Sequence, residues 1–176
     1  MNYILIGLPG SGKSTVGVML AKYIGFEFLD TDLVIQKQQG KKLSEIIEER
    51  GPEGFMAVEN EILSGIRADR TVIATGGSAI YGEDAMKNLK SGGAVCIYLK
   101  MSLREMKRRL SHTFRKRGVV LRSGETVKDM YNERVALYEK YADITIDEYR
   151  LDSEQTLQQI LEKIRDKPSD SGSHLK

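Results

Sequence analysis

Eight residues near the start of the chain have the types and the spacing needed to bind a chain of phosphate groups. Residues 7–14, Gly-Leu-Pro-Gly-Ser-Gly-Lys-Ser, fit the pattern G-x-x-x-x-G-K-[ST]. The glycines permit backbone conformations that a side chain forbids, so amide groups and a helix N-terminus can face an anion. Lys13 would then reach the β- and γ-phosphates, and the Ser14 hydroxyl would coordinate Mg²⁺. We expect the nucleotide to be bound by Gly10, Ser11, Gly12, Lys13, Ser14 and Thr15.

The segments on either side of this motif support its interpretation as a P-loop. The apolar run 3–6 predicts a buried strand, and residues 14–23 have the spacing of apolar side chains typical of a helix. A chance glycine-rich turn between a strand and a helix is the alternative. It is disfavoured because the Lys-Ser pair and both flanks agree with the motif.

Two carboxylates, Asp30 and Asp32, form a second candidate site. They follow a short strand in which Phe26 and Phe28 alternate, and ligands of open α/β sheets bind beyond the carboxyl ends of strands. Asp30 would take part in the Mg²⁺ shell, directly or through water, and Asp32 would orient or deprotonate an acceptor hydroxyl. The alternative is that Asp32 caps the helix expected from Leu33, and one residue can do both.

Basic residues supply a third group of candidates. A helix predicted at 102–110 carries four of them, of which Arg108 or Arg109 can stack on an adenine ring, and the cofactor-binding assignment is given to Arg109. The loop 111–124 is rich in Arg and Lys, and we expect it to be a lid that closes over bound nucleotide. Arg134 lies beside the apolar face of the helix predicted at 126–141, which indicates a buried partner.

The remaining chain predicts one α/β domain. Strands are expected at 3–6, 26–30, 71–75, 94–99 and 142–147, alternating with helices, which favours a three-layer sandwich with a five-stranded parallel sheet. Gly76 and Gly77 follow a core strand and indicate either close backbone approach to a ligand or a tight turn. The helical insertion 33–62, with a break near Gly51, is the expected acceptor-binding segment. The single domain would span 1–166, with 167–176 as a disordered tail.

Composition excludes several classes of function. The chain of 176 residues has a net charge of +2 and no long basic run, so neither a nucleic-acid nor a membrane partner is expected. Its single cysteine, Cys96, lies in an apolar run and predicts a buried thiol. Two histidines are too few for a histidine-based metal site. With no basic leader and no run long enough to span a bilayer, we expect a cytoplasmic protein, and we expect it to act as a monomer on a small molecule.

Taken in order, the motifs resemble those of the shikimate kinase family, a branch of the nucleoside-monophosphate-kinase-like P-loop fold. The resemblance covers residues 1–165. Besides the P-loop, it is carried by Phe28-Leu-Asp-Thr-Asp32, Gly51…Phe55…Glu59, Ile73-Ala-Thr-Gly-Gly77, and Arg134-Val-Ala-Leu-Tyr138 followed by Tyr141-Ala-Asp143. It implies ATP-dependent phosphorylation of the 3-hydroxyl of shikimate.

The resemblance also implies roles for individual residues. Lys13 and Ser14 would bind phosphate and Mg²⁺, Asp30 would lie near the metal, and Asp32 would contact the acceptor hydroxyl. Arg117 would be the lid arginine that reaches the transferred phosphoryl group. The substrate carboxylate would be clamped by Arg134, and the backbone of Gly76 and Gly77 would line the acceptor pocket.

Three positions depart from the family pattern. Met56 stands where the family usually has an arginine that grips the carboxylate, and Ser78 replaces the third glycine of a Gly-Gly-Gly run. The lid reads Arg117-Gly-Val-Val in place of Arg-Pro-Leu-Leu. We count Met56 and Ser78 among the substrate-binding positions.

These departures leave two other interpretations open. One is a kinase for a different alcohol or sugar acid; a nucleoside monophosphate acceptor is less favoured, because 33–62 has no arginine before Arg50. The other is a nucleotide-binding module without turnover, which is disfavoured because a pure binder has no use for Asp32.

Overall fold

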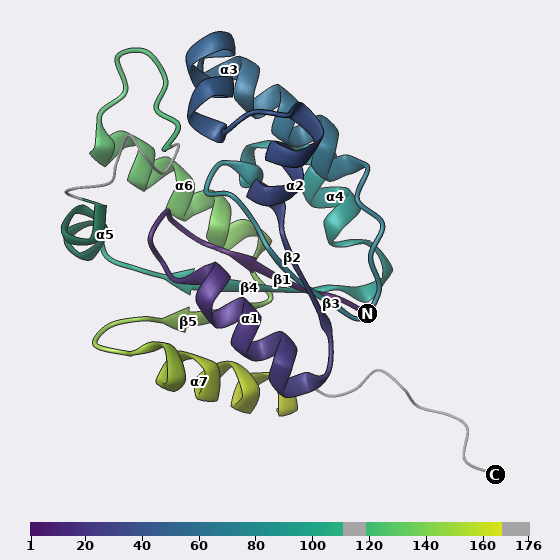
Figure 1. Cartoon of the computed structure of the whole chain (residues 1–176). Helices are drawn as coiled ribbons and strands as arrows, with labels where there is room; N and C mark the ends of the chain where they lie inside the picture. The colour runs from purple at the N-terminus through teal and green to yellow at the C-terminus, as the bar shows by residue number, and fades with distance from the viewer. Residues whose placement is uncertain (111–118, 167–176) are drawn as a thin grey trace.

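The structure is a computed structural model that describes residues 1–110 and 119–166 (Figure 1). The first eight residues of the expected lid, Arg117 among them, and the expected tail 167–176 lie outside this range. In the described part of the chain, no helix combines the length and the apolar character that a bilayer crossing requires.

Five parallel strands form a single sheet. They are β1 (Tyr3–Ile6), β2 (Glu27–Asp30), β3 (Thr71–Ala74), β4 (Val95–Lys100) and β5 (Ile144–Asp147). The order across the sheet is β2-β3-β1-β4-β5, with every neighbouring pair parallel. The predicted five-stranded parallel sheet is therefore confirmed.

Helices cover both faces of the sheet (Figure 1). One face is covered by α1 (Lys13–Ile24) and α7 (Ser153–Arg165), whose apolar residues join one core cluster. A larger cluster on the other face is built with α2 (Thr31–Gln39), α3 (Leu43–Ser64), α4 (Glu83–Leu89), α5 (Leu103–Leu110) and α6 (Val127–Tyr141). Two short 3₁₀ turns, η1 (Ala79–Tyr81) and η2 (Ser91–Gly93), complete the described elements.

The side chains of β1 contribute to the hydrophobic core on both faces of the sheet. Successive side chains of a strand point to opposite faces of the sheet. Ile4 and Ile6 accordingly belong to the larger core cluster, and Tyr3 and Leu5 belong to the smaller one. All four are buried, as expected for a central strand of a parallel sheet covered on both sides.

Two helices begin or bend differently from the sequence expectation. α2 begins at Thr31, because the Asp30 carboxylate accepts a hydrogen bond of 3.0 Å from the backbone N–H of Asp32 and caps the helix. Asp30, not Asp32, is therefore the cap. The two helices expected around Gly51 follow each other without a loop, as the two halves of α3, because Gly51 alone takes a non-helical conformation (φ 71°, ψ 174°) and Pro52 starts the second half.

The topology brings three loops to one edge of the sheet. β1 leads into the P-loop, β2 ends at Asp30, and β3 runs into residues 75–77. β1 lies between β3 and β4, so the chain direction across the sheet reverses there, and such a switch point leaves a crevice beyond the strand ends.

Candidate active site

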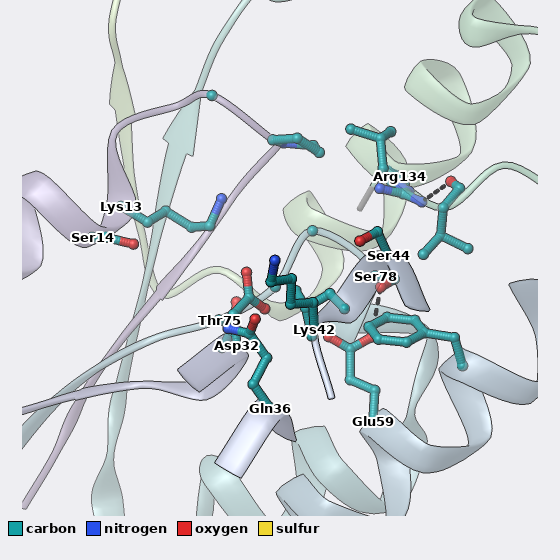
Figure 2. Close-up of a pocket in the computed structure, with 18 of the residues that line it drawn as sticks. Lys13, Ser14, Asp32, Gln36, Lys42, Ser44, Glu59, Thr75, Ser78 and Arg134 are labelled. Atoms are coloured by element: carbon teal, nitrogen blue, oxygen red, sulfur yellow. Dashed lines mark hydrogen bonds between the residues drawn. The ribbon is translucent and has the colours of Figure 1, made fainter. Parts of the chain in front are cut away.

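A cavity of about 420 Å³ occupies this crevice, a size typical of small-molecule sites. One side is formed by the P-loop and the start of α2, and another by residues 75–78 beyond β3 (Figure 2). The start of α3, with Phe55 and Glu59 further along that helix, forms a third side, and Val119, Val120 and Arg134 complete the lining.

The P-loop is held in shape by hydrogen bonds within itself. Gly12 has φ +82°, which an L side chain rarely adopts, and a Cβ on Gly7 would lie 2.7 Å from the Leu99 carbonyl oxygen. The backbone N–H of Ser11 donates to the Leu8 carbonyl at 3.1 Å, and Ser11, itself part of the loop, is fully buried. The glycine conformations and this hydrogen bond together determine the shape of the loop.

Lys13 lies over the loop it belongs to. Its ammonium group donates to the carbonyl oxygens of Gly7 at 2.8 Å and Leu8 at 3.0 Å. Burial lowers the pKa of Lys13 to about 8, against the raising influence of Asp32 and other carboxylates. A phosphate group at this place would supply the negative charge that the buried ammonium group favours.

Ser14 and Asp30 form a pair of oxygen donors beside the loop. The Ser14 hydroxyl donates to Asp30 Oδ2 at 2.7 Å. Within residues 1–110 and 119–166, no three His, Cys, Asp or Glu side chains cluster as a metal cage. Two oxygen ligands beside a phosphate site nevertheless fit Mg²⁺, which usually retains several waters and shares substrate phosphates with one or two protein groups.

Asp32, in the first turn of α2, lines the cavity on the side of Lys13 and the P-loop (Figure 2). Burial, then the neighbouring Asp30 charge, raises the pKa of Asp32 to about 6, while Lys13 lowers it. A Cβ on Gly76 would lie 2.9 Å from Asp32 Oδ1 and would also clash with Glu59 Oε1. Glycine is required at position 76 because two carboxylates crowd against its backbone.

Glu59 and Ser78 form a buried pair at the wall of the cavity. The Ser78 hydroxyl donates to Glu59 Oε2 at 2.6 Å (Figure 2), and both residues are less than 5% exposed. Glu59 Oε1 has no hydrogen-bond partner among the described residues. Burial raises the pKa of Glu59 to about 7, and the hydrogen bond from Ser78 counteracts this. The carboxyl group thus sits at the boundary between its two protonation states near neutral pH.

Arg134 is the largest fully buried side chain of the described residues, and it lines the cavity. Its Nη2 donates to the Val120 carbonyl at 2.6 Å (Figure 2), whereas its Nε has no partner in the part of the chain that the structure describes. A Cβ on Gly77 would lie 3.1 Å from Nη1, so glycine leaves room for the guanidinium. The buried partner expected for Arg134 is therefore a backbone carbonyl, and donors remain for a ligand.

Most of the residues predicted from the sequence meet at this cavity. Its lining includes Gly10, Gly12, Lys13, Ser14, Thr15, Asp32, Gly76, Gly77, Ser78 and Arg134. Asp30 adjoins it through Ser14. Arg109 is not among the lining residues that the structure describes, but it donates to the Gly10 carbonyl of the P-loop at 3.0 Å. Met56 is not among the lining residues of the described chain; its side chain packs against the larger core cluster.

Other lining residues were missed by the sequence analysis. They are Gln36, Lys42, Leu43, Ser44, Val119 and Val120. Glu59 was noted only as part of a motif, without a role. No local pattern distinguishes these residues from ordinary helix or loop positions, because only the packing of α2, α3 and α6 around the crevice brings them together.

A parallel sheet of this order, a P-loop after β1 and a facing carboxylate define the class of P-loop kinases that act on small molecules. The family model described as "Shikimate kinase" matches residues 9–165. The chain belongs to the shikimate kinase family, whose members use ATP, and the predicted family and enzyme class, a phosphotransferase with an alcohol acceptor, are confirmed.

Individual relatives are similar to this protein over nearly the whole chain. A shikimate kinase from Thermodesulfovibrio yellowstonii is 36% identical over 164 residues, 92% of this chain and 94% of the relative. One from Pseudomonas paraeruginosa is 34% identical over 173 residues, 96% and 98% of the two chains. The solved shikimate kinase from Acinetobacter baumannii in complex with shikimate has a TM-score of 0.82 at 30% identity, covering 96% of this chain and 94% of that one.

Proposed function

We propose that this protein transfers the γ-phosphoryl group of ATP to the 3-hydroxyl of shikimate. The observation that carries the proposal is the pairing, across one cavity, of a buried guanidinium with an unpartnered Nε, Arg134, and a carboxylate beside the P-loop, Asp32. Such a pair fits an acceptor that has a carboxylate at one end and a hydroxyl at the other. The Acinetobacter baumannii relative, solved with shikimate, supports the same assignment.

In this proposal the P-loop residues perform the electrostatic part of the reaction. The backbone amides of residues 10–15 bind the phosphates, and Lys13 leaves the carbonyls of Gly7 and Leu8 to contact the β- and γ-phosphates. Asp32 accepts a hydrogen bond from the acceptor hydroxyl and holds its oxygen in line with the γ-phosphorus. Positioning of the reactants and stabilisation of charge on the transferring group account for most of the rate acceleration in such reactions.

Mg²⁺ would be held by Ser14, with Asp30 acting on it directly or through water. When bound, the ion supplies charge neutralisation on the β- and γ-phosphates. The Asp30–Ser14 hydrogen bond of 2.7 Å holds the two oxygens close together.

The remaining assignments follow from the same reaction scheme. Arg109, braced against the P-loop, covers the adenine, and Arg117 in the lid 111–124 contacts the transferred phosphoryl group. The segment 33–62 binds the acceptor, and it supplies several of the cavity-lining residues. One domain spanning 1–166 acts as a monomer.

A coupled ADP-release assay tests this function. Purified protein with ATP and MgCl₂ should turn over shikimate, and the product should carry phosphate on the 3-hydroxyl by ³¹P and ¹H NMR. A panel of other hydroxylated carboxylates, including sugar acids, tests the alternative raised by Met56 and Ser78. Turnover of a panel member with no turnover of shikimate would overturn the shikimate assignment while preserving the kinase.

A further inference from the structure

We propose that Lys42 supplies the second positive charge for the acceptor carboxylate, in place of the arginine that is absent at Met56. This inference rests on the proposed function. It assigns substrate recognition to the turn between α2 and α3, at a residue outside the family motifs that the chain matches.

Lys42 lies at the wall of the cavity. It immediately precedes α3 and lines the cavity together with the next two residues, Leu43 and Ser44. Figure 2 shows its side chain directed into the pocket, which Lys13 and Arg134 border on opposite sides. The backbone N–H of Lys42 donates to the Glu45 carboxylate at 2.7 Å, which fixes the start of the helix through the main chain.

Lys42 and its neighbour Lys41 differ in their ion pairs within the described residues. The adjacent Lys41 donates to both carboxylate oxygens of Glu49, at 2.8 and 2.6 Å, on the outside of the molecule. Within the described residues, the Lys42 ammonium group has no such ion pair or hydrogen bond. Two neighbouring lysines thus serve different purposes: Lys41 joins the turn to α3, and Lys42 presents its charge to the cavity.

A bound carboxylate has more hydrogen-bond acceptor sites than Arg134 alone can fill. A carboxylate has two oxygens and about four acceptor sites. Arg134 has already given one donor to the Val120 carbonyl, and the Met56 side chain offers none. The remaining cavity-lining cation of the described chain besides Lys42 is Lys13, which is bound to the P-loop at the phosphate end.

The N-terminus of α3 adds to the positive electrostatic potential of Lys42 and Arg134 at this side of the cavity. The first backbone amides of a helix have no partner within it, and its N-terminus carries partial positive charge. Leu43 and Ser44 contribute the first turn of a long helix at the cavity wall, and the buried Arg134, with its unpartnered Nε, lines the same cavity. Lys42, this helix end and Arg134 together fit a carboxylate better than a hydroxyl or an apolar group.

The test compares Lys42→Met with Lys41→Met, which removes the same charge one residue away and outside the cavity lining. Lys42→Met should raise the KM for shikimate about tenfold, the low end for a charge-assisted hydrogen bond at an exposed residue. Its kcat and its KM for ATP should stay within about twofold of the wild type, since Lys42 is not assigned to phosphate. Lys41→Met should leave all three unchanged, and Lys42→Arg should retain most of the wild-type affinity.

An acceptor without a negative charge distinguishes recognition of the carboxylate by Lys42 from a general effect on the shape of the acceptor site. With the carboxamide of shikimate, measured by calorimetry in the presence of a non-hydrolysable ATP analogue, Lys42→Met and wild type should bind equally. An equal loss with shikimate and its carboxamide, or equal KM values for shikimate in the Lys42→Met and Lys41→Met proteins, would overturn the role of Lys42. Failure of the wild type to phosphorylate shikimate would instead overturn the proposed function itself.

Discussion

The phosphate end and the acceptor end of the cavity are built in opposite ways. At the phosphate end, residues 7–14 satisfy one another: Lys13 and Ser11 donate to carbonyls of the same loop. At the acceptor end, Asp32, Glu59 and Arg134 come from α2, α3 and α6, segments far apart in the chain. There Glu59 Oε1 and Arg134 Nε are buried without a partner in the described residues. The P-loop is organised by bonds within one segment, whereas the acceptor end is assembled from three helices and keeps two polar atoms without a partner in the described residues.

The difference has an energetic meaning. A buried polar atom left unsatisfied costs about 1–3 kcal/mol, and such atoms are rare in folded proteins. Glu59 and Arg134 line the same cavity, but these two atoms are out of reach of water in this conformation, so a substrate can satisfy them only if the surrounding side chains shift. Binding of an acceptor with matching oxygens and hydrogens removes the penalty, and an acceptor that lacks them does not. Selectivity for the acceptor and instability of the empty site therefore have the same cause.

The largest effect is expected where the two ends meet, at Asp32. Asp32→Asn should lower kcat by about 10²–10⁴-fold. The neutral amide cannot accept the proton of the acceptor hydroxyl, and it does not orient that hydroxyl as the carboxylate does. Binding of a non-hydrolysable ATP analogue, measured by calorimetry, should change less than about threefold. In the wild type, kcat/KM should fall as the pH drops through about 6, where the Asp32 carboxylate becomes protonated, and this limb should vanish in the variant.

The control for this variant is Asp84→Asn, an exposed carboxylate in the first turn of α4, which should leave turnover unchanged. Turnover of Asp32→Asn close to that of Asp84→Asn would contradict the assigned role of Asp32. A large loss of ATP binding in Asp32→Asn would mean that Asp32 contributes to the nucleotide site. The phosphate end and the acceptor end would then not be functionally separate.

A second, smaller effect is expected at Arg134, whose replacement should change both acceptor binding and stability. Arg134→Lys keeps the positive charge but loses the planar set of donors that serves both the Val120 carbonyl and a ligand. The KM for shikimate should rise about ten- to a hundredfold, and the free energy of unfolding should fall by about 1–3 kcal/mol because a buried carbonyl loses its donor. Binding of the ATP analogue should be affected little.

Arg122→Lys provides the matched control for this comparison. Arg122 donates to Glu133 at 2.9 Å and, like Arg134, lies over the ring of Tyr81, but it does not line the cavity. Denaturant unfolding and steady-state kinetics should show Arg122→Lys close to the wild type. If both variants raised the KM equally, the effect would come from the shared packing on Tyr81 and not from a ligand-facing guanidinium.

The same contrast explains how far the sequence predicts the molecule. The phosphate end could be predicted because a P-loop is local: the glycine and Lys-Ser spacing alone determines its backbone and its charge. The parallel sheet follows from apolar runs alternating with helices. The bond between Ser78 and Glu59, and the position of Lys42, depend on how α3 packs against the loop beyond β3, which no spacing within one segment encodes. For Met56 the local motif was misleading. Its position in the motif predicted a substrate-binding residue, whereas its side chain packs against the larger core cluster.

A final effect, on stability and not on kinetics, tests the partly unsatisfied state of the acceptor end directly. Burial raises the pKa of Glu59 from 4.5 to about 7, so the folded protein holds the proton more tightly than the unfolded chain does. The contribution of Glu59 to stability is therefore complete below about pH 4.5 and is lost as the pH rises through about 7, with a slope of at most about 1.4 kcal/mol per pH unit. Glu59→Gln can still accept the Ser78 hydroxyl and should remove this part of the slope, measured by denaturant unfolding between pH 4.5 and 8.

Glu61→Gln, two residues along the same helix and exposed, is the control and should keep the wild-type slope. Saturating shikimate with the ATP analogue adds the decisive comparison. A ligand that satisfies Glu59 should reduce the pH dependence of wild-type stability and leave that of Glu59→Gln nearly unchanged. An identical slope in wild type and Glu59→Gln would mean that Glu59 is already satisfied in the free protein. The acceptor end would then be as complete as the P-loop, and the contrast between the two ends would not hold.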